Sequence, residues 1–241
     1  MKIAVCTPYY AHVHSNYAYC LAKMLMHTVQ ARITFNEAVV TPEVEIFMKS
    51  SSTLPALRNE LVQDALEWGA NYLLWADADH NFPPEALLRL LSLNLPVVGV
   101  NYPRRTFPTY PTAVALNGEE LVWTTEERAN NGEITEVSSL GLGLCLMDMT
   151  VFHTLHEHAR AQGRENFWPL FAFEIVPGQM QGVGEDLYFF TRLREAGVSL
   201  YLDHALSWRI GHSREQMITN ADAIAEREAF TARHGRSFGD A

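Results

Sequence analysis

Two aspartates separated by one residue carry the clearest chemical signal in this sequence. Asp77 and Asp79 follow an apolar run at 71–76, and His80 comes directly after them. In an extended chain, residues two apart lie on the same face, so we expect the two carboxylates side by side. Neighbouring carboxylates repel each other, and burial adds to this cost, unless a cation lies beside them. Carboxylate oxygens bind Mg²⁺ and Mn²⁺, so the pair predicts a divalent-cation site, with a simple strand-to-helix turn as the alternative.

The first hundred residues alternate between two hydrophobic patterns, and this alternation places the aspartates at the end of a strand. Strand-like runs occur at 2–7, 43–49, 71–76 and 97–100, and helix-like patterns occur at 15–28, 55–69 and 85–93. Such an alternation predicts a parallel sheet with helices on both faces. Ligands of these sheets bind beyond the carboxyl ends of the strands, which is where Asp77 and Asp79 are expected.

The second half of the chain predicts a mixed arrangement. Strands are expected within 133–149 and at 198–202, and helices at 151–161, 185–196 and 214–236. Asn117-Gly118 predicts a hairpin turn between two apolar runs. Thr150 is expected to cap the helix that follows it, and Gly197 to close the next one. The glycine-rich stretch 175–184 predicts a mobile loop.

The composition excludes several classes of protein. The 241 residues are 48% apolar and 19% charged, which predicts a folded chain with a sizeable core. Lys and Arg total 18 against 28 Asp and Glu, and a net charge of −10 argues against binding to nucleic acid or anionic membranes. Cys6, Cys20 and Cys145 lack paired spacing, which favours buried thiols in a reducing cytoplasm. No apolar run predicts an integral membrane segment, and the break at Thr7-Pro8 argues against a signal peptide.

Several blocks of the sequence resemble GT-A type glycosyltransferases of the family 2-like group. The longest reads LRNELVQDALEWGANYLLWADADHNFPPEALLRLL, in which an Arg-Asn helix precedes a strand that ends in the Asp-X-Asp motif. The others, in the expected order, are VVGVNYPRR, GLGLCLMDMTVF, GEDLYFFTRLREAGVSLYLD and RIGH. The resemblance covers most of the chain. It implies a GT-A like α/β fold, with a doubly wound, mostly parallel sheet and a mixed, hairpin-bearing C-terminal half.

The resemblance also implies how the chain is organised. We expect a single GT-A domain over 1–241. Within it, 1–103 would form the nucleotide-binding half and 104–213 the acceptor and metal half, with a C-terminal helix at 214–241.

The resemblance further implies a cation site for a sugar nucleotide. A Mn²⁺ or Mg²⁺ ion would bridge the two phosphates of a UDP- or GDP-type sugar donor. Asp79 would bind the ion directly, Asp77 would lie near the ribose or the sugar and contribute to the metal site, and His212 would be the late third ligand. His80 has two interpretations, either as another ligand or as a solvent-facing loop residue.

The donor is expected to contact residues from several elements. Thr7 and Pro8 would sit beside the nucleotide, and Arg58 would approach the base or the diphosphate. Arg104, with its neighbour Arg105, follows the fourth strand, and guanidinium groups suit phosphate, although a surface loop is an equal interpretation.

The resemblance places the acid–base chemistry in Gly184-Glu185-Asp186. Asp186 would match the general base of inverting members, and Glu185 is the neighbouring candidate. Acidic residues also stabilise helix N-termini through the helix dipole, which is the structural alternative for this pair. A base for the acceptor hydroxyl and the lack of an obvious covalent nucleophile favour inversion, and retention stays open.

The expected function is metal-dependent transfer of a sugar from a nucleoside-diphosphate donor to a hydroxyl of a glycan, lipid-linked or small-molecule acceptor. A sugar-nucleotide nucleotidyltransferase is one alternative. The stretch TPYYAHVHSN after the first strand has no Gly, Lys or Arg to cradle a triphosphate, which disfavours it. A non-catalytic nucleotide- or carbohydrate-binding module of the same fold is the other alternative.

Overall fold

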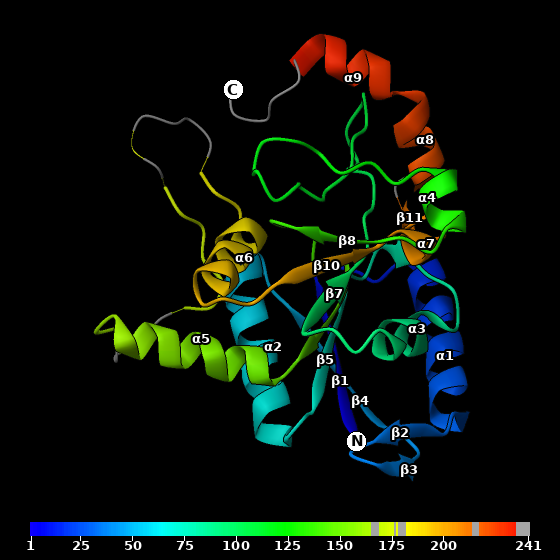
Figure 1. The fold of residues 1–241 in the computed structure, drawn as a ribbon. Coiled ribbons are helices and arrows are strands. Elements are labelled where there is room, and N and C mark those ends of the chain that lie inside the picture. The colour runs from blue at the N-terminus through cyan, green and yellow to red at the C-terminus, as the bar shows by residue number, and fades with distance from the viewer. Residues whose placement is uncertain (165–168, 176, 178–181, 214–216, 235–241) are drawn as a thin grey trace.

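A computed structural model describes residues 1–164, 169–175, 177, 182–213 and 217–234, and its centre is a seven-stranded sheet (Figure 1). The strands run in the order β4-β1-β5-β9-β7-β10-β8. Their bounds are β1 (Lys2–Tyr9), β4 (Glu43–Ser50), β5 (Tyr72–Ala76), β7 (Val97–Gly99), β8 (Ile134–Val137), β9 (Leu144–Asp148) and β10 (Leu200–Asp203). Strands from both halves of the sequence therefore share one sheet.

The sheet is mostly parallel, as predicted, but one antiparallel strand lies in its middle. β1 pairs in parallel with β4 and β5, and β7 pairs in parallel with β10. β9 lies between β5 and β7 and runs antiparallel to both, and β8 forms an antiparallel edge beside β10. The protein is thus a mixed α/β structure with a large, mostly parallel sheet.

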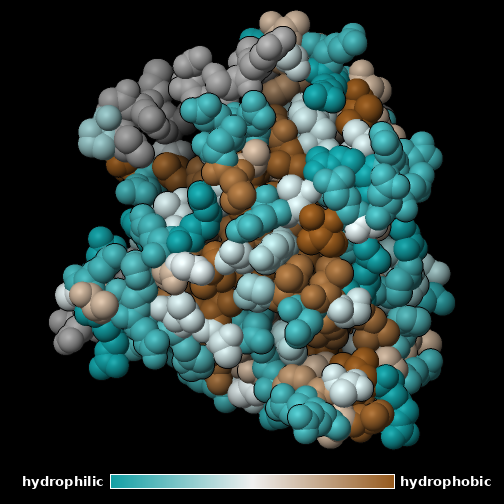
Figure 2. Space-filling view, viewed as in Figure 1, coloured by the Kyte–Doolittle hydropathy of each residue, from teal (hydrophilic) through white to brown (hydrophobic). Residues whose placement is uncertain are grey.

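Helices cover both faces of this sheet because side chains alternate along each strand. On β1, Ile3 and Val5 join the core under α1 and α3, whereas Ala4 and Cys6 join the core under α2, α5 and α6. The helix bounds are α1 (Ser15–Gln30), α2 (Leu54–Trp68), α3 (Ala86–Ser92), α5 (Thr150–Ala161) and α6 (Glu185–Glu195). In the space-filling view, hydrophobic residues show in the middle of the face and hydrophilic residues cover its sides (Figure 2).

Helix ends largely follow the sequence signals. Pro55 lies in the first turn of α2, and Gly69 ends this helix in the left-handed conformation, with φ of 77°. The expected cap at Thr150 is wrong, because Thr150 is already helical. The carboxylate of Asp148 instead accepts hydrogen bonds from the backbone N–H and the hydroxyl of Thr150, at 2.8 and 2.6 Å.

A second, three-stranded sheet joins distant parts of the chain. Its order is β12-β11-β6, with β6 (His80–Asn81), β11 (Gly211–Ser213) and β12 (Met217–Thr219). β11 pairs antiparallel with both neighbours. This sheet brings the segment after β5 into contact with the segment after β10.

The C-terminal region departs from the predicted single helix. Residues 214–216 and 235–241 lie outside the described part of the chain, and 217–219 form β12. Two short helices follow, α8 (Asn220–Ala225) and α9 (Arg227–His234). The side chains and backbone N–H groups of Thr219 and Asp222 form a capping box, which starts α8 after a strand rather than within one long helix.

The remaining elements are short. A two-stranded sheet pairs β2 (Ile33–Phe35) with β3 (Ala38–Val40), and α4 (Glu126–Asn130) and α7 (His204–Ser207) flank β8 and β10. The predicted turn at Asn117-Gly118 connects the bridged residues Val114 and Leu121. Of the loop predicted at 175–184, residues 176 and 178–181 lie outside the described residues. No helix in the described ranges has the length and apolar character to cross a membrane.

Candidate metal and nucleotide site

A cleft of about 400 Å³ opens at the carboxyl ends of β1, β4 and β5. Open α/β sheets place their ligands at this edge. The lining residues come from the ends of the three strands, the start of α2 and the loop after β7. They are Pro8, Tyr9, Tyr10, His12, His14, Ser51, Ser52, Leu54, Leu57, Asp77, Ala78, Asp79 and Arg105.

The two aspartates at this edge do not lie on one face, which corrects the expectation of an extended chain. β5 ends at Ala76, and the backbone N–H of His80 then donates to the carbonyl of Asp77 at 3.2 Å. This turn directs the carboxylates of Asp77 and Asp79 toward different partners.

Asp77 is held by Arg58, which is almost completely buried on α2. The Nη2 atom of Arg58 lies 3.2 and 3.3 Å from the two carboxylate oxygens of Asp77, and its Nε lies 3.4 Å from Oε1 of Glu185. The guanidinium also lies over the ring of Trp75, 5.0 Å from the centroid. Arg58 thus links the end of β5 to the start of α6 through its contacts with the side chains of Asp77 and Glu185.

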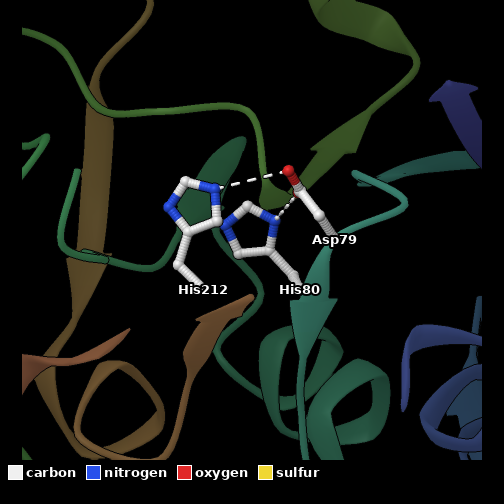
Figure 3. Close-up of side chains that lie close together, drawn as sticks. All are labelled: Asp79, His80 and His212. Atoms are coloured by element: carbon white, nitrogen blue, oxygen red, sulfur yellow. Dashed lines mark ion pairs between the residues drawn. The ribbon is translucent and has the colours of Figure 1, made fainter. Parts of the chain in front are cut away.

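Asp79 forms a separate cluster with His80 and His212, whose ring nitrogens are directed toward its carboxylate (Figure 3). Nδ1 of His80 lies 3.1 Å from Oδ1 of Asp79, and Nε2 of His212 lies 3.5 Å from Oδ2. One ligand atom from each of the three residues lies within 4.8 Å of the others. Asp77 is not a member of this cluster.

The small sheet fixes the two histidines of this cluster. His80 on β6 and His212 on β11 are register partners, and their rings stack with centroids 4.4 Å apart. Nδ1 of His212 donates a hydrogen bond to the carbonyl of Pro103 at 2.8 Å, and this contact orients the ring so that Nε2 faces Asp79. His80 is 1% exposed, so its interpretation as a solvent-facing loop residue is wrong.

Glycine is required beside this cluster. A Cβ atom on Gly143 would lie 2.4 Å from Cε1 and 2.5 Å from Nε2 of His80. The carbonyl of Gly143 also accepts from the backbone N–H of Asp77 at 2.9 Å, and its N–H donates to the Tyr102 hydroxyl at 3.1 Å. Part of the sequence block GLGLCLM therefore packs against the cluster.

The protonation of these groups follows from burial and charge. Burial raises the pKa of Asp79, but contacts with His212 and His80 outweigh this and hold it well below its usual range. Burial lowers the pKa of His80, which favours the neutral imidazole. Burial raises the pKa of Glu185, although Arg58 opposes the change. The cluster thus presents one carboxylate and at least one neutral ring nitrogen.

These residues fit a divalent cation. Both ring nitrogens of His80, including the Nδ1 atom that faces Asp79, are buried and have no hydrogen-bond partner among the described residues. A buried ring nitrogen without a partner is costly, and a bound cation removes this cost. Carboxylate and imidazole together suit first-row transition ions such as Mn²⁺ better than the all-oxygen sites typical of Mg²⁺.

Of the other residues expected to contact the sugar nucleotide, only some line the cleft. Pro8 lines the cleft, whereas Thr7 is fully buried and its hydroxyl bonds to the hydroxyl of Tyr17. Arg104 lies over the ring of Tyr110, 5.1 Å from the centroid, and does not line the cleft. Its neighbour Arg105 lines the cleft and contacts Asp79 instead.

Glu185 and Asp186 occupy the first turn of α6 after Gly184, as the sequence predicts. Glu185 is buried and directed toward Arg58. Asp186 is half-buried, and its Oδ1 accepts from the backbone N–H of Leu187 at 2.7 Å. The second carboxylate therefore remains more accessible than the first.

Sequence reasoning missed several residues that line the cleft. Tyr9 ends β1, and Tyr10, His12 and His14 come from the segment that follows it. Ser51 and Ser52 follow β4. Their position directly after predicted parallel strands was the available signal.

Comparison with known proteins identifies similarity at the level of the fold. No protein-family model matches this chain, and no curated protein matches its sequence. Solved structures do match it. One is A197 from STIV, with 16% sequence identity and a TM-score of 0.55, in an alignment that covers 92% of this chain and 92% of that chain. At this identity, the similarity extends to the fold alone.

Proposed function

We propose that this protein is a metal-dependent glycosyltransferase that moves a sugar from a UDP- or GDP-type donor to an acceptor hydroxyl. The observation that carries this proposal is the convergence of Asp79, His80 and His212 beside the cleft at the carboxyl ends of β1, β4 and β5. The sequence blocks that resemble GT-A enzymes support it, because Asp79, His80 and His212 all lie within them. A nucleoside diphosphate needs both a cleft for the nucleoside and positive charge for its phosphates.

The strand-end cleft would hold the nucleoside. Pro8 and Tyr9 provide apolar surface, and the hydroxyls of Ser51 and Ser52 are available for polar contacts with a base or ribose. Arg58 holds the carboxylate of Asp77, which lines the cleft and can accept a hydrogen bond from a ribose or sugar hydroxyl.

Asp79, His80 and His212 would hold the cation. When bound, the cation supplies positive charge that stabilises the negative charge on the departing diphosphate. The two imidazoles favour Mn²⁺ over Mg²⁺ as this cation. His212 is already oriented by its hydrogen bond to Pro103, and such outer contacts fix a ligand for binding.

Asp186 would act as the general base. In the transfer, the bond between the anomeric carbon and the diphosphate oxygen breaks, and the diphosphate leaves with the electron pair. The acceptor oxygen bonds to the same carbon, and its proton passes to the carboxylate of Asp186. Direct displacement by the acceptor inverts the anomeric configuration. Glu185 would assist by keeping Arg58 in place between the two carboxylates.

The acceptor is a hydroxyl of a glycan, a lipid-linked glycan or a small molecule. The proposal is tested first by thermal unfolding with UDP or GDP, with and without Mn²⁺. Nucleotide at about 100 times its dissociation constant adds about 2.7 kcal/mol to the free energy of unfolding. We expect this stabilisation only when Mn²⁺ is present, and we expect Asp79→Asn to remove it. Glu119→Gln, which alters an exposed carboxylate, is the matched control.

Turnover then separates the three candidate functions. Release of UDP or GDP from a sugar nucleotide, together with a new glycosidic bond, supports the proposal. Release of pyrophosphate from a nucleoside triphosphate and a sugar phosphate indicates a nucleotidyltransferase instead. Metal-dependent binding of sugar nucleotides without any turnover indicates a binding module.

A further inference from the structure

Arg105 already places a positive charge on the carboxylate that would bind the cation. Its Nη1 atom lies 2.9 Å from Oδ2 of Asp79, and the same oxygen faces Nε2 of His212 at 3.5 Å. A cation bound to this oxygen and to His212 would need the space and the lone pairs that Arg105 uses. The two positive groups therefore compete for one carboxylate.

The segment that carries Arg105 is anchored through its backbone. The carbonyl of Pro103 accepts from His212, the N–H of Arg104 donates to the carbonyl of Tyr110 at 2.9 Å, and the hydroxyl of Thr109 donates to the carbonyl of Arg104 at 2.6 Å. Thr109 is in turn bound by Glu226 at the end of α8, through its N–H at 2.8 Å. The start of the Arg105 side chain is thus fixed close to the cluster.

The side chain of Arg105, in contrast, has room to move. It is 50% exposed, whereas the side chain of Arg58 is 3% exposed and bound on two sides. A half-exposed arginine changes rotamer without opening a cavity in the core. Movement of its guanidinium would break the contact with Asp79 and leave the core packing unchanged.

Arg105 is also the source of positive charge in the cleft. Among the described lining residues, it is the single Lys or Arg. A diphosphate prefers the planar fork of a guanidinium, which can donate two parallel hydrogen bonds. Arg58 cannot fill this role without leaving the buried Glu185 and the partly buried Asp77 unpaired.

We propose that Arg105 is an exchangeable counter-ion, which neutralises Asp79 while the cation is absent and moves to the diphosphate when the cation binds Asp79. The second step rests on the proposed function, because it needs a diphosphate ligand. The exchange makes metal and nucleotide binding cooperative. The cation releases the arginine that the nucleotide uses, and the nucleotide keeps that arginine away from the cation site.

Metal binding without nucleotide tests the first step. Mn²⁺ alone is titrated into the wild-type chain, Arg105→Gln and Arg104→Gln, with free Mn²⁺ measured by electron paramagnetic resonance. We expect Arg105→Gln to bind Mn²⁺ about fivefold more tightly than the wild type, because it loses a competing ion pair. Arg104→Gln removes the same charge one residue away and should bind as the wild type does. Equal or weaker binding by Arg105→Gln overturns the counter-ion role.

Nucleotide binding at saturating Mn²⁺ tests the second step. We expect Arg105→Gln to bind UDP or GDP about tenfold more weakly than the wild type, since a charge-assisted contact to phosphate is lost. Arg104→Gln should leave this affinity unchanged. Wild-type affinity in Arg105→Gln overturns the transfer of Arg105 to the diphosphate. If even the wild type binds neither nucleotide, the proposed function and the second step are both wrong, and the Mn²⁺ titration still decides the first step.

Discussion

His80 and His212 lie directly opposite each other on β6 and β11, and their rings stack at an interplanar angle of 15° with centroids 4.4 Å apart. These residues are far apart in the sequence, and the small sheet brings them together beside Asp79. Burial lowers the pKa of His80, which favours its neutral imidazole. A neutral imidazole has the lone pair that a metal ligand needs.

Loss of either histidine should weaken cation binding. We expect His212→Gln and His80→Gln each to lower Mn²⁺ affinity by about tenfold or more, the range seen when metal sites lose supporting or direct contacts. Electron paramagnetic resonance measures this, with His153→Gln as the control on an exposed helix position. Because His80 is buried, circular dichroism must first show that its variant is folded. A folded His80→Gln variant with wild-type affinity would exclude His80 as a ligand.

The buried carboxyl of Glu185 predicts a pH dependence of stability. Burial raises its pKa in the folded protein above the value in the unfolded chain. The folded protein therefore keeps this proton at pH values where the unfolded chain has lost it, and the free energy of unfolding falls as pH rises through this range. This loss is absent from Glu185→Gln, so the stability of the variant relative to the wild type should rise as pH increases above about 4, the ordinary pKa of Glu.

Urea unfolding of both proteins at several pH values measures this difference. Other titrating groups contribute equally to the two curves, so only the difference between them is informative. A difference that stays constant with pH would show that the pKa of Glu185 is not raised.

Asn59 should matter for stability and not for the cation. Its Nδ2 donates to the carbonyls of Pro55 and Phe171, both at 2.8 Å, and its Oδ1 accepts from the N–H groups of Leu170 and Phe171 at 2.9 and 3.2 Å. Asn59→Ala leaves these partly buried groups unpaired, at a cost of about 1–3 kcal/mol. We expect a lower melting temperature with unchanged Mn²⁺ affinity. Gln63→Ala, one turn further along α2, should change stability by less than about 0.5 kcal/mol.

Asp186 should affect turnover far more than binding. We expect Asp186→Asn to lower kcat by about 10²- to 10⁴-fold, the usual contribution of a general base. Stabilisation by Mn²⁺ and nucleotide should persist, because Asp186 lies outside the cation cluster. Glu195→Gln at the other end of α6 is the control, and turnover close to the wild-type value in Asp186→Asn would assign the base elsewhere.

The sequence predicts the parallel part of the fold because each strand and helix there has its own hydrophobic period. It does not predict the position of β9 between β5 and β7. Strand order depends on contacts between distant segments, and the apolar run of β9 suits any buried strand. The prediction of a single C-terminal helix is wrong for a related reason. Residues 217–219 pair with β11, and this long-range contact interrupts a segment whose local pattern is helical.

The candidate site was predictable at positions where the residue type and its motif together indicate the chemistry. Asp79 and His212 were named from motif positions, and the structure brings them together. The separation of Asp77 from Asp79 was not predictable, because the turn after Ala76 depends on a backbone hydrogen bond. The choice between Arg104 and Arg105 depends on which way one loop faces, and neither composition nor spacing contains that information.

The most direct test of the account is anomalous scattering from crystals grown with Mn²⁺ and UDP or GDP. The account predicts a manganese peak within bonding distance of Asp79 and His212, with the diphosphate of the nucleotide on its open side. A manganese peak at another place, or a nucleotide bound away from the cleft at the ends of β1, β4 and β5, would contradict it.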